Sequence, residues 1–211
     1  MMREQVLQKV VSRTVRDIYS RPAGHLVGYS VDAGGGLRTV GIDHGGAIFK
    51  EYPADQVIFD NEAVILVPRW RSDVERLSKL RATVQKRAQA LEQLRGENQV
   101  PEHVYMTLKA QLGEDASRLQ SNYDSMRDTL ERRSADLQTR RGALEQFIAA
   151  IMVQHRSGEI DDGAYESARR SVEEMLGQDD REQADLRNAL RLLTSSDEAL
   201  APGAKSATGL Q

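Results

Sequence analysis

The feature that most constrains the fold is a long helix-favouring segment in the middle of the chain. From Glu102 to about Ser157 there is no proline, and glycine interrupts the segment only at Gly113 and Gly142. Apolar or small side chains return every seven residues, which is the repeat of a coiled-coil seam. About 56 helical residues would form a rod of roughly 84 Å, and such a rod cannot bury its own apolar stripe. The segment therefore requires helical partners.

Two rows of side chains define the predicted seam. One row holds Ala116, Tyr123, Leu130, Leu137, Leu144 and Ile151, and a companion row holds Leu112, Leu119, Met126 and Phe147. Arg133 and Arg140 take positions in this pattern where an apolar side chain is expected. Part of the rod surface is therefore expected to contact other subunits.

Two segments with the same pattern of helix-stop signals border the long helix. Gly96 and Pro101 mark the first, and Gly158 and Gly163 mark the second. The predicted corner residues are Val100, Pro101 and Tyr105 at the first corner and Gly158, Ile160 and Tyr165 at the second. Aligned on the two tyrosines, the segments form a weak internal repeat, which predicts a helical hairpin corner at each.

The corners divide the rod into three predicted helices, at about 72–95, 102–157 and 161–193. Short corners force antiparallel neighbours, so the outer helices would cover the two halves of the central one in a Z-shaped rod. Their predicted lengths fit, because both outer helices would end opposite residues 125–127. The alternative is a parallel coiled-coil homodimer with the three segments in line.

The N-terminal part, residues 1–70, has the shorter period of β-strands. Six short segments rich in Val, Ile and Tyr are separated by turn signals, at 14–19, 26–32, 38–43, 47–52, 57–60 and 63–68. They predict a small β-barrel, with a short helix before Ser12. The fold class is thus α+β, a small N-terminal barrel followed by a long coiled coil (71–194) built of antiparallel helical hairpins. Residues 195–211 are small and polar and predict a disordered tail.

Signals for catalysis are missing. The chain of 211 residues has no cysteine, and its four histidines are scattered without metal-ligand spacing. Gly34, Gly35 and Gly36 are not followed by the lysine of a phosphate-binding loop, so they predict a hairpin turn. We expect no enzyme activity, catalytic residue, cofactor, metal or small-molecule substrate. No apolar run is long enough to span a membrane and no signal peptide is present, which favours the cytoplasm.

Charge is unevenly distributed along the chain. The segment 71–99 has seven basic and four acidic residues, whereas 161–211 has six basic and eleven acidic ones. Pro68 and Trp70 mark the predicted hinge between barrel and rod. A candidate patch for an anionic membrane surface or DNA follows, consisting of Arg69, Arg71, Arg76 and Lys79. The alternative is a solvated flank of the coiled coil.

Two stretches resemble known families. Residues 14–28 are similar to the opening of a PRC-barrel domain, although Ser20 stands where a glycine is usual. The second resemblance is to the CdvA family of archaeal cell-division scaffolds. It rests on the basic helix, on the two Gly-Glu…Tyr corners and on the segment that leaves the barrel, Val64-Ile65-Leu66-Val67-Pro68-Arg69-Trp70. The resemblance implies a filament-forming protein at the inner membrane face of the division site, which recruits the ESCRT-III-like protein CdvB.

The tail departs from that family. In some members it adds a strand to the ESCRT-III partner, but residues 195–211 offer only Leu200 and Leu210 as large apolar side chains. PRC barrels also resemble a domain of ribosome-maturation factors, so an adaptor in RNA processing is the alternative function. The barrel segment carries eight basic and eight acidic residues and no basic stripe with aromatics, which does not favour RNA binding. A membrane-anchored reaction-centre subunit would need a spanning helix.

Overall fold

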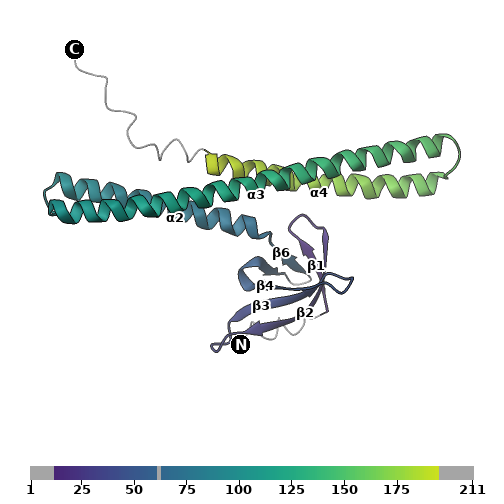
Figure 1. Ribbon diagram of the computed structural model, residues 1–211. Coiled ribbons are helices and arrows are strands. Elements are labelled where there is room, and N and C mark those ends of the chain that lie inside the picture. The colour runs from purple at the N-terminus through teal and green to yellow at the C-terminus, as the bar shows by residue number, and fades with distance from the viewer. Residues whose placement is uncertain (1–11, 61–62, 195–211) are drawn as a thin grey trace, which may run out of the picture. The chain divides into compact units, whose positions relative to one another are not determined.

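The computed structural model describes residues 12–60 and 63–194 (Figure 1). Its strands are β1 (Thr14–Asp17), β2 (Pro22–Val31), β3 (Leu37–Asp43), β4 (Phe49–Pro53), β5 (Val57–Phe59) and β6 (Val64–Leu66), and a 3-10 helix η1 (Ala54–Gln56) joins β4 to β5. Three long helices follow, α2 (Arg69–Gly96), α3 (Glu102–Arg156) and α4 (Asp162–Thr194). The predicted fold class is confirmed. The predicted helix before Ser12 and the predicted disordered tail lie outside the described residues.

The strands form one half-barrel sheet in the order β4-β3-β2-β1-β6-β5. Neighbouring strands are antiparallel except β1 and β6, which run parallel with Val15 opposite Val64. The glycine-rich turn between β2 and β3 is confirmed as a hairpin turn, in which the Asp32 amide donates to the Gly36 carbonyl at 2.8 Å.

The sheet buries a small apolar core on its inner face. Its buried members are Val15, Leu26, Val40, Ile42, Val57 and Val64. Gly41 is buried as well, because the ring of Phe49 lies across it. A Cβ at Gly41 would stand only 2.7 Å from that ring. The close approach explains why the strand carries a glycine in an otherwise apolar row.

The connection from β1 to β2 turns earlier than the sequence predicts. The turn signals at 21–24 place the reversal too late, because β2 already begins at Pro22, a strand end where the missing N–H is tolerated. The chain reverses at Ser20, whose φ of 70° is the conformation that glycine adopts most easily. The Asp17 carboxylate stabilises this turn by accepting from the amides of Tyr19 (2.9 Å) and Arg21 (2.8 Å).

The chain divides into two compact units. The first combines the sheet, through Ser72, with Leu137–Gln183, and the second combines Asp73–Asp136 with the last turns of α4 from Ala184. In the second unit α2 folds back on α3, as shown by the hydrogen bond from the Tyr105 hydroxyl to Glu92 at 2.8 Å. In the first unit α4 folds back on α3. Both hairpins thus form within one chain.

Most of the predicted seam is buried between these helices. Leu119, Tyr123, Leu130, Leu137 and Ile151 are buried, and Leu112 and Leu144 are partly buried. The prediction is wrong for one member of the companion row, because Phe147 is 59% exposed. The helical repeat of 3.6 residues turns this row away from the buried face over successive heptads, so Phe147 lies at its border.

Candidate functional site

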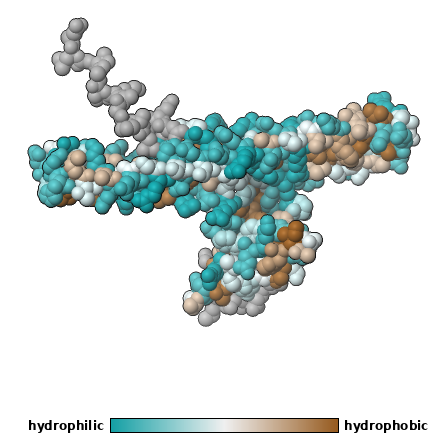
Figure 2. All heavy atoms as spheres, in the orientation of Figure 1, coloured by the Kyte–Doolittle hydropathy of each residue, from teal (hydrophilic) through white to brown (hydrophobic). Residues whose placement is uncertain are grey.

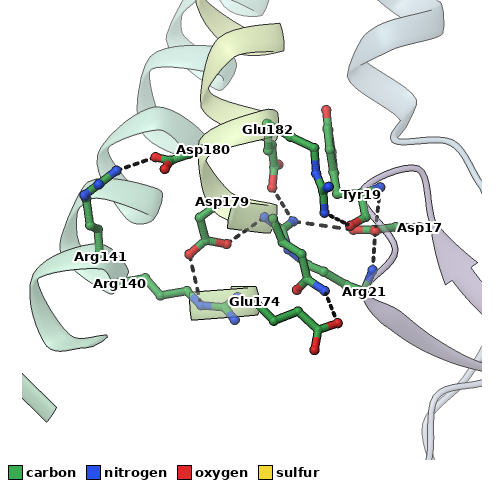
Figure 3. Close-up of polar contacts among 11 residues, drawn as sticks. Asp17, Tyr19, Arg21, Arg140, Arg141, Glu174, Asp179, Asp180 and Glu182 are labelled. Carbon is green, nitrogen blue, oxygen red and sulfur yellow. Dashed lines mark hydrogen bonds and ion pairs between the residues drawn. The ribbon is translucent and has the colours of Figure 1, made fainter. Parts of the chain in front are cut away.

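The turn between β1 and β2 directs one arginine toward a helix in the same compact unit. The Arg21 guanidinium lies between three carboxylates (Figure 3). It binds Asp179 of α4 at 2.7 Å, contacts Asp17 at 3.4 Å and forms an ion pair with Glu182 of α4. The Arg21 side chain is 13% exposed, and those of Asp179 and Glu182 only 5% and 3%. This cluster, which we call the ionic anchor, fastens the sheet to α4.

Further contacts surround the ionic anchor. Arg140 of α3 reaches the second oxygen of Asp179 at 3.4 Å, and Arg181 donates to the backbone carbonyl of Tyr19 at 3.1 Å. Figure 3 shows these groups converging from the β1–β2 turn, α3 and α4. Arg141 of α3 forms an ion pair with Asp180 on the same hairpin. The anchor therefore ties three elements of the first unit at one point.

The charges of the anchor depend on one another. Burial alone would lower the pKa of Arg21, but its hydrogen bond with Glu182 and the charges of Glu182, Asp17 and Asp179 outweigh burial and raise the pKa above its usual value. The guanidinium is thus permanently charged. It compensates the two buried carboxylates, those of Asp179 and Glu182, which would be very unfavourable in the interior without a cation.

The first hairpin corner ends α2 with an asparagine rather than with the predicted glycine. Helix α2 reaches Gly96, and Asn98 then adopts the left-handed conformation with φ of 55°. The Asn98 amide donates to the carbonyl of Arg95 at 3.0 Å, and the Gln99 amide to that of Leu94 at 2.9 Å. These are the two hydrogen bonds of a Schellman motif, so Asn98 rather than Gly96 stops the helix.

The second corner has the same geometry. Gly158 has φ of 79°. Its amide donates to the backbone carbonyl of His155 at 3.1 Å, and the Glu159 amide donates to that of Gln154 at 2.9 Å. Asn98 and Gly158 are separated by the same interval as the tyrosines on which the sequence repeat is aligned. The weak repeat is therefore also a repeat of backbone structure.

Side chains repeat as well. At the first corner Arg95 lies 4.2 Å above the ring of Tyr105 and pairs with Glu102 in the first turn of α3, at 3.3 Å. Lys109 also donates to the Tyr105 hydroxyl, at 2.9 Å. Glu92 accepts from the same hydroxyl, and this hydrogen bond, together with nearby Lys109, lowers the pKa of Glu92.

At the second corner His155 takes the position of the arginine. Its ring stacks on Tyr165 with a centroid separation of 4.4 Å, and its Nε2 lies 2.7 Å from Asp162 in the first turn of α4. Asp161 caps that helix by accepting from the Ala164 amide at 2.7 Å. Sequence reasoning identified the tyrosines but missed these stacked partners. Extending the alignment back from the tyrosines would have paired Arg95 with His155.

The remaining corner residues lie in the loops between helices. Val100 and Ile160 are partly buried, and Pro101 is exposed immediately before α3 begins. The Pro101 carbonyl accepts from the Tyr105 amide at 3.0 Å, which starts the helix. Their assignment as functional residues stays a prediction.

We expect opposite effects of alanine at two glycines near the second corner. A Cβ would meet no atom within 4 Å at Gly158 or at Gly142 inside α3. Gly158→Ala places alanine in a left-handed conformation and should lower the free energy of unfolding by about 1–2 kcal/mol. Gly142→Ala, the matched control, should raise it by about 0.5–1 kcal/mol. Urea unfolding followed by circular dichroism measures both, and equal effects would contradict the left-handed cap.

The first corner predicts a pH-dependent effect of Tyr105→Phe. A carboxylate whose pKa is lowered by folding stabilises the fold above its unfolded pKa, and this contribution disappears as the pH falls through the lowered value. The variant loses the hydrogen bond to Glu92, so its melting temperature should lie a few degrees below that of the parent at pH 7. The difference should shrink below about pH 4.5. Tyr165→Phe, at the equivalent position of the other corner, is the control; a loss that is constant with pH would contradict this role of Glu92.

The predicted hinge and basic patch lie at the start of α2. Pro68 precedes the helix, and Trp70 is partly buried with its indole nitrogen fully covered. Arg76 pairs with Asp73 at 2.9 Å and Lys79 with Glu75 at 2.6 Å, and the hydrogen bond from Lys79 lowers the pKa of Glu75. These pairings fit the alternative of a solvated flank. Binding of the patch to an anionic surface stays a prediction.

The described part of the chain shows neither a metal cluster nor a membrane-spanning helix. Between residues 12 and 194, leaving out 61–62, no three His, Asp or Glu side chains are close enough to hold a metal ion. Within the same residues no helix has a stretch sufficiently long and apolar to cross a bilayer. The arrangement instead consists of ionic and aromatic contacts that fix helices and sheet.

Sequence reasoning also missed the ionic anchor. A signal was present, because Val172, Asp179, Leu186 and Leu193 follow each other at seven-residue intervals in α4 and all four are buried. An acid in a heptad row of apolar residues indicates a buried charge that requires a cation. The sequence does not say which cation.

The helical part of the chain matches a known protein family. Residues 69–208 match the family model of the CdvA-like coiled-coil domain, a range that includes all three helices and both corners. A protein of Sulfolobus acidocaldarius named Cell division protein A is 24% identical over 164 residues, which cover 78% of this chain and 68% of that protein.

Proposed function

Because the chain belongs to the CdvA-like coiled-coil family, we propose that it is a non-catalytic structural scaffold of archaeal cell division. In this proposal it polymerises at the division site, on the inner face of the membrane, and recruits the ESCRT-III-like protein CdvB. The observation that carries the proposal is the family match across all three helices. The name of the Sulfolobus relative, Cell division protein A, supports the role in cell division.

Exposed apolar side chains support polymerisation. Figure 2 shows hydrophobic residues gathered at the end of the α3–α4 hairpin. On α3, Phe147 and Val153 are 59% and 67% exposed, and Met152 is also exposed. Isolated exposed apolar residues are common, but several on neighbouring turns of one helix are typical of an interaction surface. A second copy of the chain is the partner that a polymer requires.

The polymer is tested by ultracentrifugation and electron microscopy of the full chain. The parent protein is expected to sediment as filaments, and Phe147→Gln combined with Val153→Gln should reduce the sedimented fraction several-fold without loss of helicity. Met106→Gln, at an exposed position of α3 in the other unit, is the matched control. A parent chain that stays in the supernatant under all conditions would contradict polymerisation. An unaffected double variant would exclude this surface only.

Recruitment and location need separate tests. Purified CdvB should be retained by the immobilised full chain, and a chain ending at residue 194 shows whether the tail is required.

The single tryptophan, Trp70, reports on membrane contact. Its emission should shift to the blue with acidic vesicles and not with duplex DNA if the start of α2 contacts lipid. In dividing cells a tagged copy should form a band at mid-cell, and co-sedimentation with ribosomes would contradict the proposal.

A further inference from the structure

The last turns of α3 carry an apolar segment that its own hairpin does not cover. Residues 147–153 contain no polar side chain and read Phe147-Ile148-Ala149-Ala150-Ile151-Met152-Val153. At 3.6 residues per turn, seven successive residues surround a helix completely. One partner helix covers only one side, so Ile151 is buried whereas Phe147 and Val153 are 59% and 67% exposed. A helix that is apolar on all sides requires a further partner.

The internal repeat shows that a hairpin can form without this composition. Shifted back by the interval between the two corner tyrosines, the apolar segment aligns with residues 87–93 of α2. The packed position is apolar in both hairpins, because Ile151 and its counterpart Leu91 are 7% and 6% exposed. At outward positions the copy in α2 is polar instead, with Arg87, Glu92 and Gln93. The outward apolar side chains of 147–153 therefore serve a contact rather than the hairpin.

A groove between α2 and α3 in the second unit can accept such a segment. Its volume is about 340 Å³, at the lower end of the range of ligand pockets. Its apolar lining consists of Leu77, Leu80 and Met126, and Leu80 is 46% exposed. The ion pair between Asp73 and Arg76, at 2.9 Å, lines it as well. An apolar lining bordered by polar groups is typical of a protein contact surface.

The charges beside the two surfaces are opposite. Directly after the apolar segment, residues 154–166 include four acidic side chains and one basic side chain. The start of α2, residues 69–81, contributes one wall of the groove and includes five basic and two acidic side chains. Opposite charges beside an apolar contact favour the encounter, and like charges disfavour a contact of either surface with itself. The segment is therefore complementary to the groove.

We propose that the apolar segment 147–153 of one copy docks in the α2–α3 groove of a second copy. The contact is heterologous, because it joins two different surfaces of the same chain. Each joined pair keeps one free segment and one free groove, so further copies can be added. This inference rests on the scaffold function proposed above and names the receptor surface for the polymer contact.

Complementation between two variants of the full chain tests the contact. Phe147→Gln combined with Val153→Gln removes the segment, and Leu80→Gln combined with Met126→Gln removes the groove. Each double variant alone should sediment several-fold less than the parent. Their equimolar mixture should give a new species of twice the mass and nothing larger, because one intact segment meets one intact groove. Leu94→Gln, at an exposed position of α2 outside the groove lining, is the matched control and should assemble like the parent.

The outcomes separate this contact from the scaffold function. A groove variant that polymerises like the parent would overturn the contact and leave polymerisation standing. So would a mixture without a new species, provided that circular dichroism shows both variants to be as helical as the parent. A parent chain that never associates would overturn both.

Disulfide formation identifies the two surfaces independently. The chain has no cysteine, so Val153→Cys and Ser125→Cys each introduce one thiol, at exposed positions of the segment and of the groove lining. Under mild oxidation a mixture of the two variants should give the mixed dimer in several-fold excess over either homodimer. Met106→Cys in place of Ser125→Cys, exposed on the same helix but outside the groove lining, should abolish this preference. A dominant homodimer of the Val153→Cys variant would show that the segment meets a second segment and would overturn the proposal.

Discussion

Arg21→Met is expected to destabilise the folded chain by about 3–5 kcal/mol, which is the usual effect of removing one partner from a buried ion pair. The substitution keeps much of the side-chain volume but leaves Asp179 and Glu182 buried without their cation. Arg140 remains in contact with Asp179 and offsets only part of the loss. Chemical unfolding monitored by circular dichroism gives the free energy.

Two further variants make this result specific. Arg21→Met combined with Asp179→Asn and Glu182→Gln removes the unpaired charges, and we expect it to recover a large part of the lost stability. Arg38→Met, at an exposed position of β3, should change the free energy of unfolding by less than about 0.5 kcal/mol. If the triple variant is less stable than Arg21→Met, the penalty does not come from uncompensated carboxylates.

Leu130→Ala is expected to cost about 2–5 kcal/mol of stability, the second large effect. Leu130 of α3 is completely buried, so alanine removes three side-chain carbons, Cγ and both Cδ atoms, from a packed position and leaves a cavity. Because the helices make up most of the second unit, the loss should be accompanied by a lower midpoint of unfolding followed at the helical signal.

The control for this variant lies on the same helix. Leu108 is 40% exposed, and Leu108→Ala should have a much smaller effect than Leu130→Ala. Intrinsic helix propensity changes equally at the two sites, so the difference measures burial alone. Comparable losses would show that Leu130 does not face the packed side of α3 in solution.

The helical part was predictable because its signals are local. A left-handed cap needs only glycine or asparagine after the helix, and a proline or an acid marks the start of the next one. These cues predicted corners near Gly158 and Pro101, and the helices turn back at both. The first stop was placed at Gly96 because glycine is the stronger signal, although Asn98 adopts the left-handed conformation.

The ionic anchor could not be predicted in the same way. Arg21 and Asp179 are separated by 158 positions, and periodicity says nothing about which distant segment a charge meets. The heptad row in α4 marks Asp179 as buried but does not name its cation, and charged residues on helices are usually solvated, so Glu182 gives no signal at all. Arg81 of α2 is the converse case: it is only 4% exposed, and a basic residue on a charged helix gives no sign in the sequence that its head group is covered.

The 158 positions between Arg21 and Asp179 have a consequence for synthesis on the ribosome. The α2–α3 hairpin of the second unit is complete once residue 136 has emerged, whereas the sheet must wait for α4 before Arg21 meets Asp179. Chains fold from the N-terminus as they are made, at about 5–20 residues per second, and contacts distant in sequence form late. The sheet should therefore remain without its helical support for several seconds. During that interval its edge strands and Arg21, which then has Asp17 but neither Asp179 nor Glu182 as a partner, are exposed to chaperones and to neighbouring nascent chains.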